Sequence, residues 1–448
     1  MSDDGVGAAG GAGAAPEEGR PGANEARSSV VFLAVIVVGF GITTLQNFYF
    51  AYVTDEHLFG EITLLLATFL TLNTLFLAGL ESAIIRFYFD RDAFASRSSL
   101  LSHLAAFWAV SAGLLLVPLL AGGYLVLQVY HLVPLRFFPD YVVITVGSLC
   151  FSFVGVFQNV YIASKEPWNY GLLLIVSRLL LFVGLAVALP AAGGSTTMMC
   201  VGALAAALLS MVVSIPVLRL FPLAAVDPKR VLRLASYTVP LGLNSLGGLG
   251  FSHGYKVILA SSLTFRDLGL YNIATQFSSA FYLVASSLLN AYTARAYSAL
   301  EQDGGRRRAI RFYLVVVVAI GLLIGVVSIP ATYVFLIYFK HGAFRPSFGL
   351  AAVLIAGQFA FLLSSYPYIL ITHVKRTVYI GVATVAGVAA TLVIAHFLLG
   401  PLGTYGAAIA TSLGLGVLAA TSMAAALCLS PRAAAPSPPP AAAAGGAS

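Results

Sequence analysis

Long apolar segments fill the chain between residues 28 and 430, and short polar stretches interrupt them at regular intervals. A helix needs about 20 apolar residues to cross the roughly 30 Å hydrocarbon core of a bilayer. Breaks at charges and at Pro/Gly pairs predict twelve such helices. They cover residues 29–53, 62–87, 99–126, 140–163, 169–190, 196–221, 231–261, 268–294, 310–338, 347–371, 377–398 and 402–429. The pattern predicts an all-α integral membrane protein with short loops.

Charge supports this count of helices. Only 9% of the residues are charged, against about 25% in soluble domains, so the surface of a soluble fold could not be covered. With the N-terminus in the cytoplasm, eighteen Lys and Arg residues fall inside and four outside (Arg136, Arg266, Lys340 and Arg345). This bias predicts cytoplasmic termini. The net charge of +7 therefore reflects membrane topology, and no nucleic-acid partner is expected.

The tails and a charged linker predict the domain organisation. Residues 1–27 and 431–448 are rich in Gly/Ala and Pro/Ala, which predicts disordered cytoplasmic tails. The first apolar stretch is longer than the roughly 7–15 residues of a signal-peptide core and should be an uncleaved first span. A linker over 223–230 would separate a six-helix lobe over 28–222 from another over 231–430.

The two lobes share positions that indicate an internal duplication. Gly60 and Arg86 recur 209 residues later as Gly269 and Arg295, and Tyr88 and Arg97 recur as Tyr297 and Arg306. Six spans is an even number, so both halves would enter the membrane with the same orientation. Parallel repeats of this kind commonly form transporters with a binding site at their interface.

Four cations in or near the spans are candidate binding residues, because charge inside a bilayer is costly and usually functional. Arg178 lies about ten residues into the fifth span, near the midplane, and needs a carboxylate, carbonyls, water or an anionic ligand. Lys256 lies about five residues from the outer end of the seventh span. Arg86 and Arg295 lie near inner helix ends, where they either bind substrate or only anchor the topology.

Neutral polar residues form a stripe along the eighth span. They recur at helical spacing, as Asn272, Gln276, Ser279, Ser286, Asn290 and Thr293. The first two spans add the neutral residues Gln46, Asn47 and Asn73, together with the acid Glu81. One interpretation is polar contact between packed helices, but a stripe along a whole helix favours a water-lined cleft. Because the charges available to such a cleft are mostly positive, an anionic group such as a phosphate would suit it.

Catalytic and cofactor motifs are not found in the sequence. There is no phosphate-binding Gly loop and no metal-ligand cluster. No loop is long enough for a soluble catalytic domain. We expect a transporter with no cofactor or metal, and not an enzyme.

Four segments resemble polysaccharide flippases, which export O-antigen and related glycans within the multidrug/oligosaccharidyl-lipid/polysaccharide (MOP) superfamily. They are AGLESAIIRFYFDRD (78–92), YTVPLGLNSL (237–246), LGLYNIATQFS (268–278) and GPLGTYGAAIAT (400–411). The resemblance places Arg86 on the family's arginine-bearing motif and Lys256 on the basic position of helix seven. An acid often precedes that basic residue in the family, whereas Tyr255 precedes Lys256 here.

The resemblance implies two six-helix lobes in a V that open alternately to either face of the bacterial inner membrane. It implies a flippase for an undecaprenyl-diphosphate-linked oligosaccharide, used in surface polysaccharide such as lipopolysaccharide. Membrane lipids and polysaccharide synthesis enzymes would be its partners. One rival is a drug/cation antiporter of the same superfamily, for which Glu81 is the only acid in the interior of a predicted span. Another is a membrane polysaccharide polymerase or ligase, which would need a large outer loop.

Overall fold

The computed structural model describes residues 21–77, 79–88, 97–129, 138–164, 166–191, 196–219, 225–236, 238, 255–301, 306–373 and 378–429. Within these ranges the regular structure is helical, and no strand forms. The N-terminal half contains α1 (Pro21–Val53), α2 (Glu56–Leu77), α3 (Leu80–Phe87), α4 (Arg97–Val129), α5 (Phe138–Ala163), α6 (Pro167–Ala191) and α7 (Thr196–Arg219). The C-terminal half contains α9 (Tyr255–Leu259), α10 (Phe265–Glu301), α11 (Arg306–Tyr338), η3 (Phe339–Gly342), α12 (Ser347–Leu363), α13 (Ser365–His373) and α14 (Val378–Leu429).

The helices agree with the predicted all-α multi-pass architecture. Nine helices in the described ranges are long and apolar enough to cross a membrane. One of these, α14, has 52 residues and folds back at Gly403, where φ is +52°, so it makes two passes. The 37 residues of α10 are also long enough to cross, although its polar stripe lowers its hydropathy. The predicted seventh span is described only at 231–236, 238 and 255–261, and the rest of it lies outside the described residues.

Three predicted boundaries differ from the structure. Helix α1 begins at Pro21, inside the predicted tail, because proline is favoured in the first turn of a helix. The predicted second span is divided into α2 and α3 by Gly79, whose φ of +78° is a left-handed conformation that suits glycine. The tenth span is likewise divided into α12 and α13 at Ser364. Residues 1–20 and 430–448, which include the rest of both predicted tails, lie outside the described residues.

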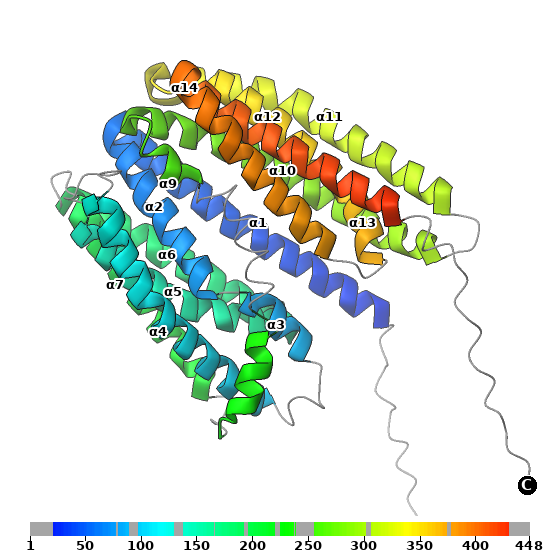
Figure 1. Ribbon diagram of the computed structural model, residues 1–448, viewed down its shortest axis with the longest axis horizontal. Coiled ribbons are helices and arrows are strands. Elements are labelled where there is room, and N and C mark those ends of the chain that lie inside the picture. The colour runs from blue at the N-terminus through cyan, green and yellow to red at the C-terminus, as the bar shows by residue number, and fades with distance from the viewer. Residues whose placement is uncertain are drawn as a thin grey trace, which may run out of the picture.

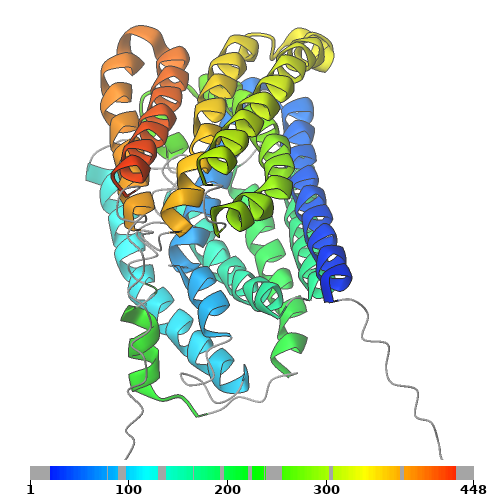
Figure 2. The same cartoon turned by 90° about the vertical axis from the view of Figure 1, so that its right-hand side faces the viewer.

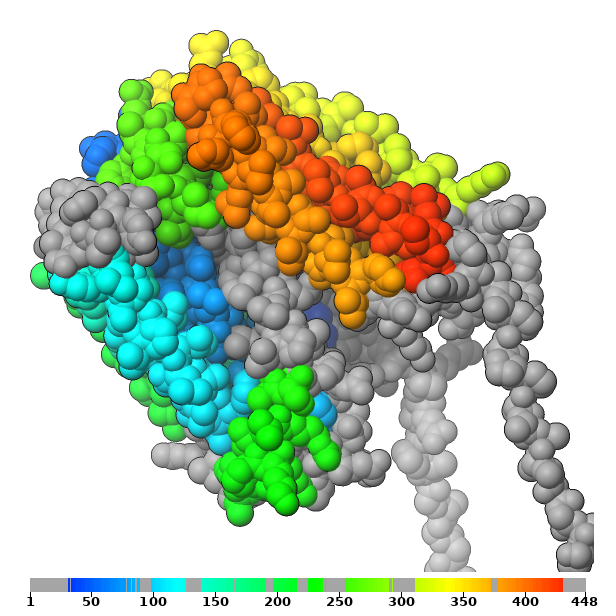
Figure 3. Space-filling model, in the orientation of Figure 1, coloured from blue at the N-terminus to red at the C-terminus, as the bar shows by residue number. Residues whose placement is uncertain are grey.

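The helices form two lobes that diverge as a V (Figures 1 and 2). In one lobe α1 packs on α6, and α5 packs on α2 and α7. In the other, α10 packs on α11 and α12, and α14 packs on α12 and α13. The start of α1 and the end of α14 lie on the same side of the molecule, toward which the lobes diverge (Figure 1). The space-filling view shows the two bodies separating toward that side (Figure 3).

The lobes meet at the opposite end, where α2 crosses α10 through two glycines. A Cβ added to Gly60 would lie 1.7 Å from the carbonyl oxygen of Phe265, and one added to Gly269 would lie 2.8 Å from that of Glu56. Glu56 and Phe265 are the first residues of their helices and stand 209 positions apart, as the two glycines do. Gly60 thus contacts the first residue of α10, and Gly269 contacts the equivalent first residue of α2. Reciprocal contacts of this kind are expected when two halves are related by a two-fold axis.

The ends of these two helices are equivalent in detail. Asp55 caps α2 by accepting a hydrogen bond from the Leu58 N–H at 2.7 Å. Thr264, 209 positions later, caps α10 by accepting from the Asp267 N–H at 3.2 Å. Side-chain oxygens at this position satisfy N–H groups of the first turn that have no partner within the helix. The structure thus supports the predicted duplication and its parallel orientation.

Polar contacts also join the lobes at this end. The Arg266 guanidinium of α10 lies 3.4 Å from the Glu56 carboxylate of α2. The Lys340 ammonium of η3 donates to the carbonyl of Ala51 at 3.2 Å and to that of Thr54. These carbonyls close the end of α1, where a helix dipole favours a cation. Two of the four cations predicted on the outer side therefore connect the lobes.

We expect Gly60→Ala to weaken this closed end. The added methyl meets backbone rather than a flexible side chain, so the lobes must separate, and overpacking of this kind typically costs about 1–3 kcal/mol. Thermal unfolding of the purified protein should show a lower midpoint. Gly113→Ala is the matched control, because a Cβ there meets nothing within 4 Å, and it should leave the midpoint unchanged or raise it slightly. Equal midpoints for the two variants would contradict this account of the crossing.

Candidate functional site

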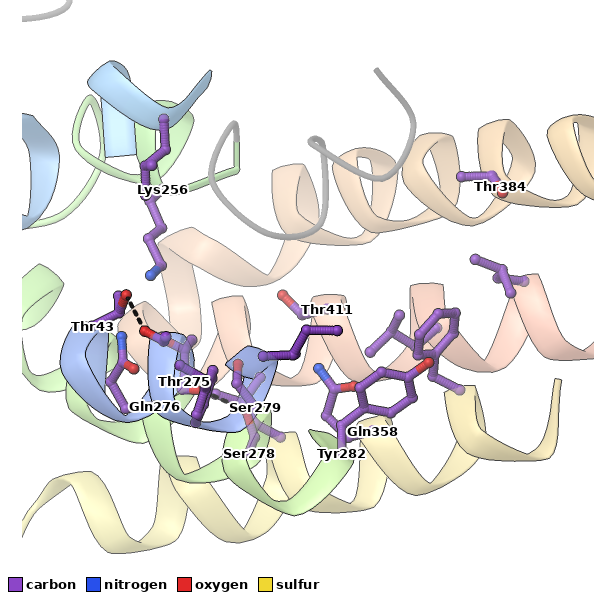
Figure 4. A pocket seen from close by; sticks show the side chains of 18 of the residues that line it. Thr43, Lys256, Thr275, Gln276, Ser278, Ser279, Tyr282, Gln358, Thr384 and Thr411 are labelled. Atoms are coloured by element: carbon purple, nitrogen blue, oxygen red, sulfur yellow. Dashed lines mark hydrogen bonds between the residues drawn. The ribbon is translucent and has the colours of Figure 1, made fainter. Parts of the chain in front are cut away.

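A cavity of about 830 Å³ lies between the lobes. On the N-terminal lobe it is bounded by α1, α2 and α6, and on the C-terminal lobe by α9, α10, α12, α13 and α14. Residues at helical spacing face it from each side, such as Ile36, Gly39, Phe40 and Thr43 of α1. The close-up shows the lining extending from Lys256 at one end to Thr384 at the other (Figure 4).

Lys256 is buried at the end of the cavity nearest the closed side. Its side chain is only 7% exposed. Its ammonium donates a hydrogen bond of 2.7 Å to the Asn272 amide oxygen on α10. The Asn272 amide nitrogen donates in turn to the Asn47 side-chain oxygen on α1 at 3.2 Å, and Asn47 donates to the Thr43 carbonyl at 2.9 Å. The chain Lys256–Asn272–Asn47 thus crosses from one lobe to the other through neutral partners.

Arg178 is the second cation at this end. It lies on the cavity-facing side of α6, one and two turns after Leu174 and Tyr170. Its guanidinium carbon is 5.9 Å from the centre of the Phe151 ring, close enough for a cation–π interaction. Within the described ranges no carboxylate pairs with Arg178 or Lys256. Both cations therefore keep their charge available to the cavity.

A smaller cavity of about 60 Å³ lies beside the larger one, and both cations line it. It is also lined by Asn47, Thr63 and Asn272. Asn47 and Lys256 are 209 positions apart, and so are Thr63 and Asn272. These two equivalent pairs therefore surround the axis that relates the lobes. Thr63 follows Gly60 by one helical turn, and Asn272 follows Gly269 by one turn, so each lies on the same helix face as its glycine.

The predicted site residues are only partly brought together. Arg178, Lys256 and Gln276 line both cavities, and Gln46 and Asn272 line the smaller one. Asn73 lines neither cavity, and its buried amide oxygen accepts no hydrogen bond from the described part of the chain. Arg86 lies on α3 and Asn290 and Arg295 on α10, with side chains outside the described part of the structure. Whether these residues bind substrate stays a prediction.

Several lining residues are absent from the sequence-based set. They are mainly hydroxyl, amide and aromatic side chains of the C-terminal lobe, namely Tyr271, Thr275, Ser278, Tyr282, Gln358, Phe361, Tyr368, Thr384 and Thr411. Tyrosine and phenylalanine in apolar spans look like ordinary packing residues. The spacing of Thr275, Ser278, Ser279 and Tyr282 was available as a signal, because steps of three and four residues place them on one face of α10.

The arrangement suits an anionic group with neutral polar parts. Two cations lie at one end, and the described lining contains hydroxyl and amide groups but no carboxylate. A phosphate accepts charge-assisted hydrogen bonds from guanidinium and ammonium groups. The described residues contain no cluster of three or more His, Cys, Asp or Glu that could hold a metal ion.

Comparison with known proteins identifies related sequences and folds. A family model described as "Polysaccharide biosynthesis protein" matches residues 26–296. Among curated protein sequences none matches the chain.

Solved structures share the fold, among them two transporters and one flippase. An inward-facing multidrug resistance MATE family transporter of the MOP superfamily has a TM-score of 0.69 at 13% identity, covering 91% of this chain and 99% of its own. The lipid II flippase MurJ, in an inward closed conformation, has a TM-score of 0.63 at 13% identity. The match covers 88% of this chain and 87% of the MurJ chain. A MOP superfamily transporter from Pyrococcus furiosus, described as having a binding pocket of reverse polarity, has a TM-score of 0.61 at 12% identity, covering 90% and 95%.

We expect Asn272→Leu to destabilise the protein, because it leaves the Lys256 ammonium buried without its acceptor. Hydrogen bonds to charged groups contribute about 1.5–3 kcal/mol. Lys256→Met removes the charge itself, so the double variant should lose less stability than the sum of the single losses. Chemical unfolding of all four proteins measures this coupling. Strictly additive losses would show that Lys256 does not depend on Asn272.

Proposed function

Because the chain belongs to the polysaccharide biosynthesis protein family, we propose that it is a flippase for a lipid-linked oligosaccharide. The cargo is an oligosaccharide on undecaprenyl diphosphate, moved from the cytoplasmic to the outer leaflet of the bacterial inner membrane for surface polysaccharide. The chain is a multi-pass membrane protein of the MOP fold. It acts in this proposal as a transporter and not as an enzyme, and it works beside the enzymes that assemble and polymerise the glycan.

The observation that carries the proposal is the pair of cations at the closed end of the cavity. Arg178 and Lys256 lie on opposite lobes, both line the two cavities, and neither pairs with a carboxylate in the described ranges. Placing two unneutralised charges inside a membrane is costly and marks a site for a ligand of opposite charge. A diphosphate between the lobes would contact both cations at once.

The cavity volume fits the headgroup rather than the whole lipid. About 830 Å³ is within the range of sites that enclose a drug-sized molecule, roughly 300–1,000 Å³. A diphosphate with its first sugars is of this size, whereas the same headgroup together with a long polyprenyl chain is larger than the cavity. The polyprenyl chain therefore stays in the bilayer while the headgroup occupies the cavity.

The way the lobes meet supports alternating access as the mechanism. They touch where α2 crosses α10 and diverge toward the side that holds the start of α1 and the end of α14. The charge bias of the loops favours a cytoplasmic location for that side, and in this proposal the conformation receives cargo from the inner leaflet. Opening to the outside requires the glycine crossing and the Arg266–Glu56 contact to separate while the cytoplasmic ends close.

The MATE-like fold makes a cation antiporter the rival function. Such a transporter needs a carboxylate in its cavity to bind the cation, whereas the described lining carries two cations and no carboxylate. Glu81 is exposed on α3 and does not line either cavity. A binding pocket of reverse polarity is also said to suggest a different function for the MOP superfamily transporter from Pyrococcus furiosus. The polarity of the cavity therefore favours an anionic cargo.

We expect Arg178→Ala and Lys256→Ala each to slow flipping by about tenfold or more, since a lost charge-assisted contact of 1.5–3 kcal/mol corresponds to that factor. The assay uses proteoliposomes that contain undecaprenyl-diphosphate-linked oligosaccharide, with its leaflet reported by an impermeant probe. Arg345→Ala is the matched control, because Arg345 is exposed and does not line the cavity; it should flip at the wild-type rate. Wild-type rates for both cavity variants would remove the cations from the mechanism.

Depletion in cells tests the function itself. Accumulation of lipid-linked oligosaccharide on the cytoplasmic leaflet, with loss of surface polysaccharide, is the expected result and identifies the glycan. Unchanged glycan levels with increased sensitivity to cationic compounds would instead support the antiporter, and Glu81→Gln would then be the variant to test.

A further inference from the structure

The two walls of the large cavity differ in chemistry. The N-terminal lobe presents mainly apolar side chains, and its described lining residues are Ile36, Gly39, Phe40, Thr43, Leu70, Tyr170, Leu174 and Arg178. The C-terminal lobe presents most of the neutral hydrogen-bonding groups, from α10, α12, α13 and α14. A ligand that needed only charge neutralisation would not require this second, polar wall.

The difference holds at repeat-equivalent positions. Ala67 and Leu70 of α2 correspond, 209 residues later, to Gln276 and Ser279 of α10. All four line one or both of the cavities. Since the helices are related by the two-fold axis, these side chains occupy equivalent places on opposite walls. The polar character therefore belongs to the C-terminal wall and does not follow from the geometry of the fold.

The polar wall also contains aromatic rings beside amides. The Tyr282 and Phe361 rings are 5.0 Å apart between centroids and tilted by 35°. Gln358 lies three residues before Phe361 on α12, on the same helix face, and Figure 4 shows Gln358 next to Tyr282. Gln358 is half-buried and makes no hydrogen bond to another described residue. Its amide donor and acceptor are therefore available to a ligand.

Aromatic rings beside a free amide match the surface of a sugar. A pyranose has faces of C–H groups that pack on aromatic rings, and its edge hydroxyls both donate and accept hydrogen bonds. The Thr275 and Ser278 hydroxyls donate to helix carbonyls, at 2.7 and 3.0 Å, so their oxygens remain acceptors for a sugar hydroxyl. The same wall thus offers stacking surface, acceptors and one free amide.

We propose that this wall, around Tyr282, Gln358 and Phe361, is a binding subsite for an uncharged sugar, the one attached to the lipid diphosphate. The inference rests on the proposed function, because the diphosphate at Arg178 and Lys256 sets the position of that sugar. The described side chains of the wall beyond Lys256 are all neutral. A uronic acid would bury its carboxylate there without a cation, which is costly, so the subsite selects against acidic sugars.

Binding of three lipids to the purified full-length protein tests the subsite. The probes are undecaprenyl diphosphate, the same lipid with glucose, and the same lipid with glucuronic acid. We expect glucose to tighten binding about tenfold over the bare diphosphate, with glucuronic acid giving no such gain. Gln358→Leu and Tyr282→Leu should each reduce the gain from glucose to about twofold or less, while affinity for the bare diphosphate stays within about twofold of wild type.

Gln158→Leu provides the control for the substitution itself. Gln158 is half-buried on α5, bonds to the Ser177 hydroxyl at 3.4 Å and does not line the cavity, so this variant should retain the full gain from glucose. Equal affinity of the wild-type protein for undecaprenyl diphosphate and for the same lipid carrying glucose would overturn the sugar subsite but not the proposed function. Equal losses for all three lipids in Gln358→Leu and Tyr282→Leu would show a structural effect and would also overturn it. Binding of none of the lipids by wild type would refute the proposed function.

Discussion

The close approach of α2 and α10, which requires glycine at positions 60 and 269, is the constraint on which the rest of the structure depends. At Gly60 the neighbouring carbonyl leaves no room even for a methyl group. Because the two contacts are reciprocal, they fix the axis that relates the lobes, and repeat-equivalent residues of both lobes line the smaller cavity beside it. One turn further along each helix stand Thr63 and Asn272, which line the smaller cavity. The same crossing thus closes one end of the molecule and positions the polar groups at the end of the cavity.

The cations keep their charge because their partners are neutral. An aspartate at position 272 would neutralise Lys256, whereas the Asn272 amide oxygen stabilises the ammonium at 2.7 Å without cancelling its charge. The further bond from Asn272 to Asn47 connects this charge to the other lobe. Asn272 therefore serves two contacts at once, accepting from the cation through its oxygen and joining the lobes through its nitrogen.

Much of the fold could be predicted from the sequence, because the apolar segments and the positive charges both report the membrane topology. Arg178 and Lys256 could also be identified, since a charge in a span is conspicuous. The partner of Lys256 could not be predicted, because Asn47 and Asn272 are 225 residues apart and meet only when the lobes assemble. Tyr282 and Gln358 were missed for a different reason: aromatic residues in apolar spans are usually packing residues, and one amide forms no pattern. The break between α2 and α3 depends on the left-handed φ of Gly79, which cannot be recognised from a continuous apolar run.

Divergence between the duplicated halves makes the two walls of the cavity different, as the proposed cargo requires. A two-fold arrangement of identical halves would present the same chemistry on both walls, whereas a headgroup of diphosphate and sugar has different needs along its length. The equivalent pairs show how the halves have diverged: asparagine stands opposite lysine at positions 47 and 256, and alanine stands opposite glutamine at 67 and 276. Gly60 and Gly269 remain alike, because the crossing tolerates no side chain in either copy. The shared axis is thus preserved by sterics, while the residues that line the cavities are free to differ.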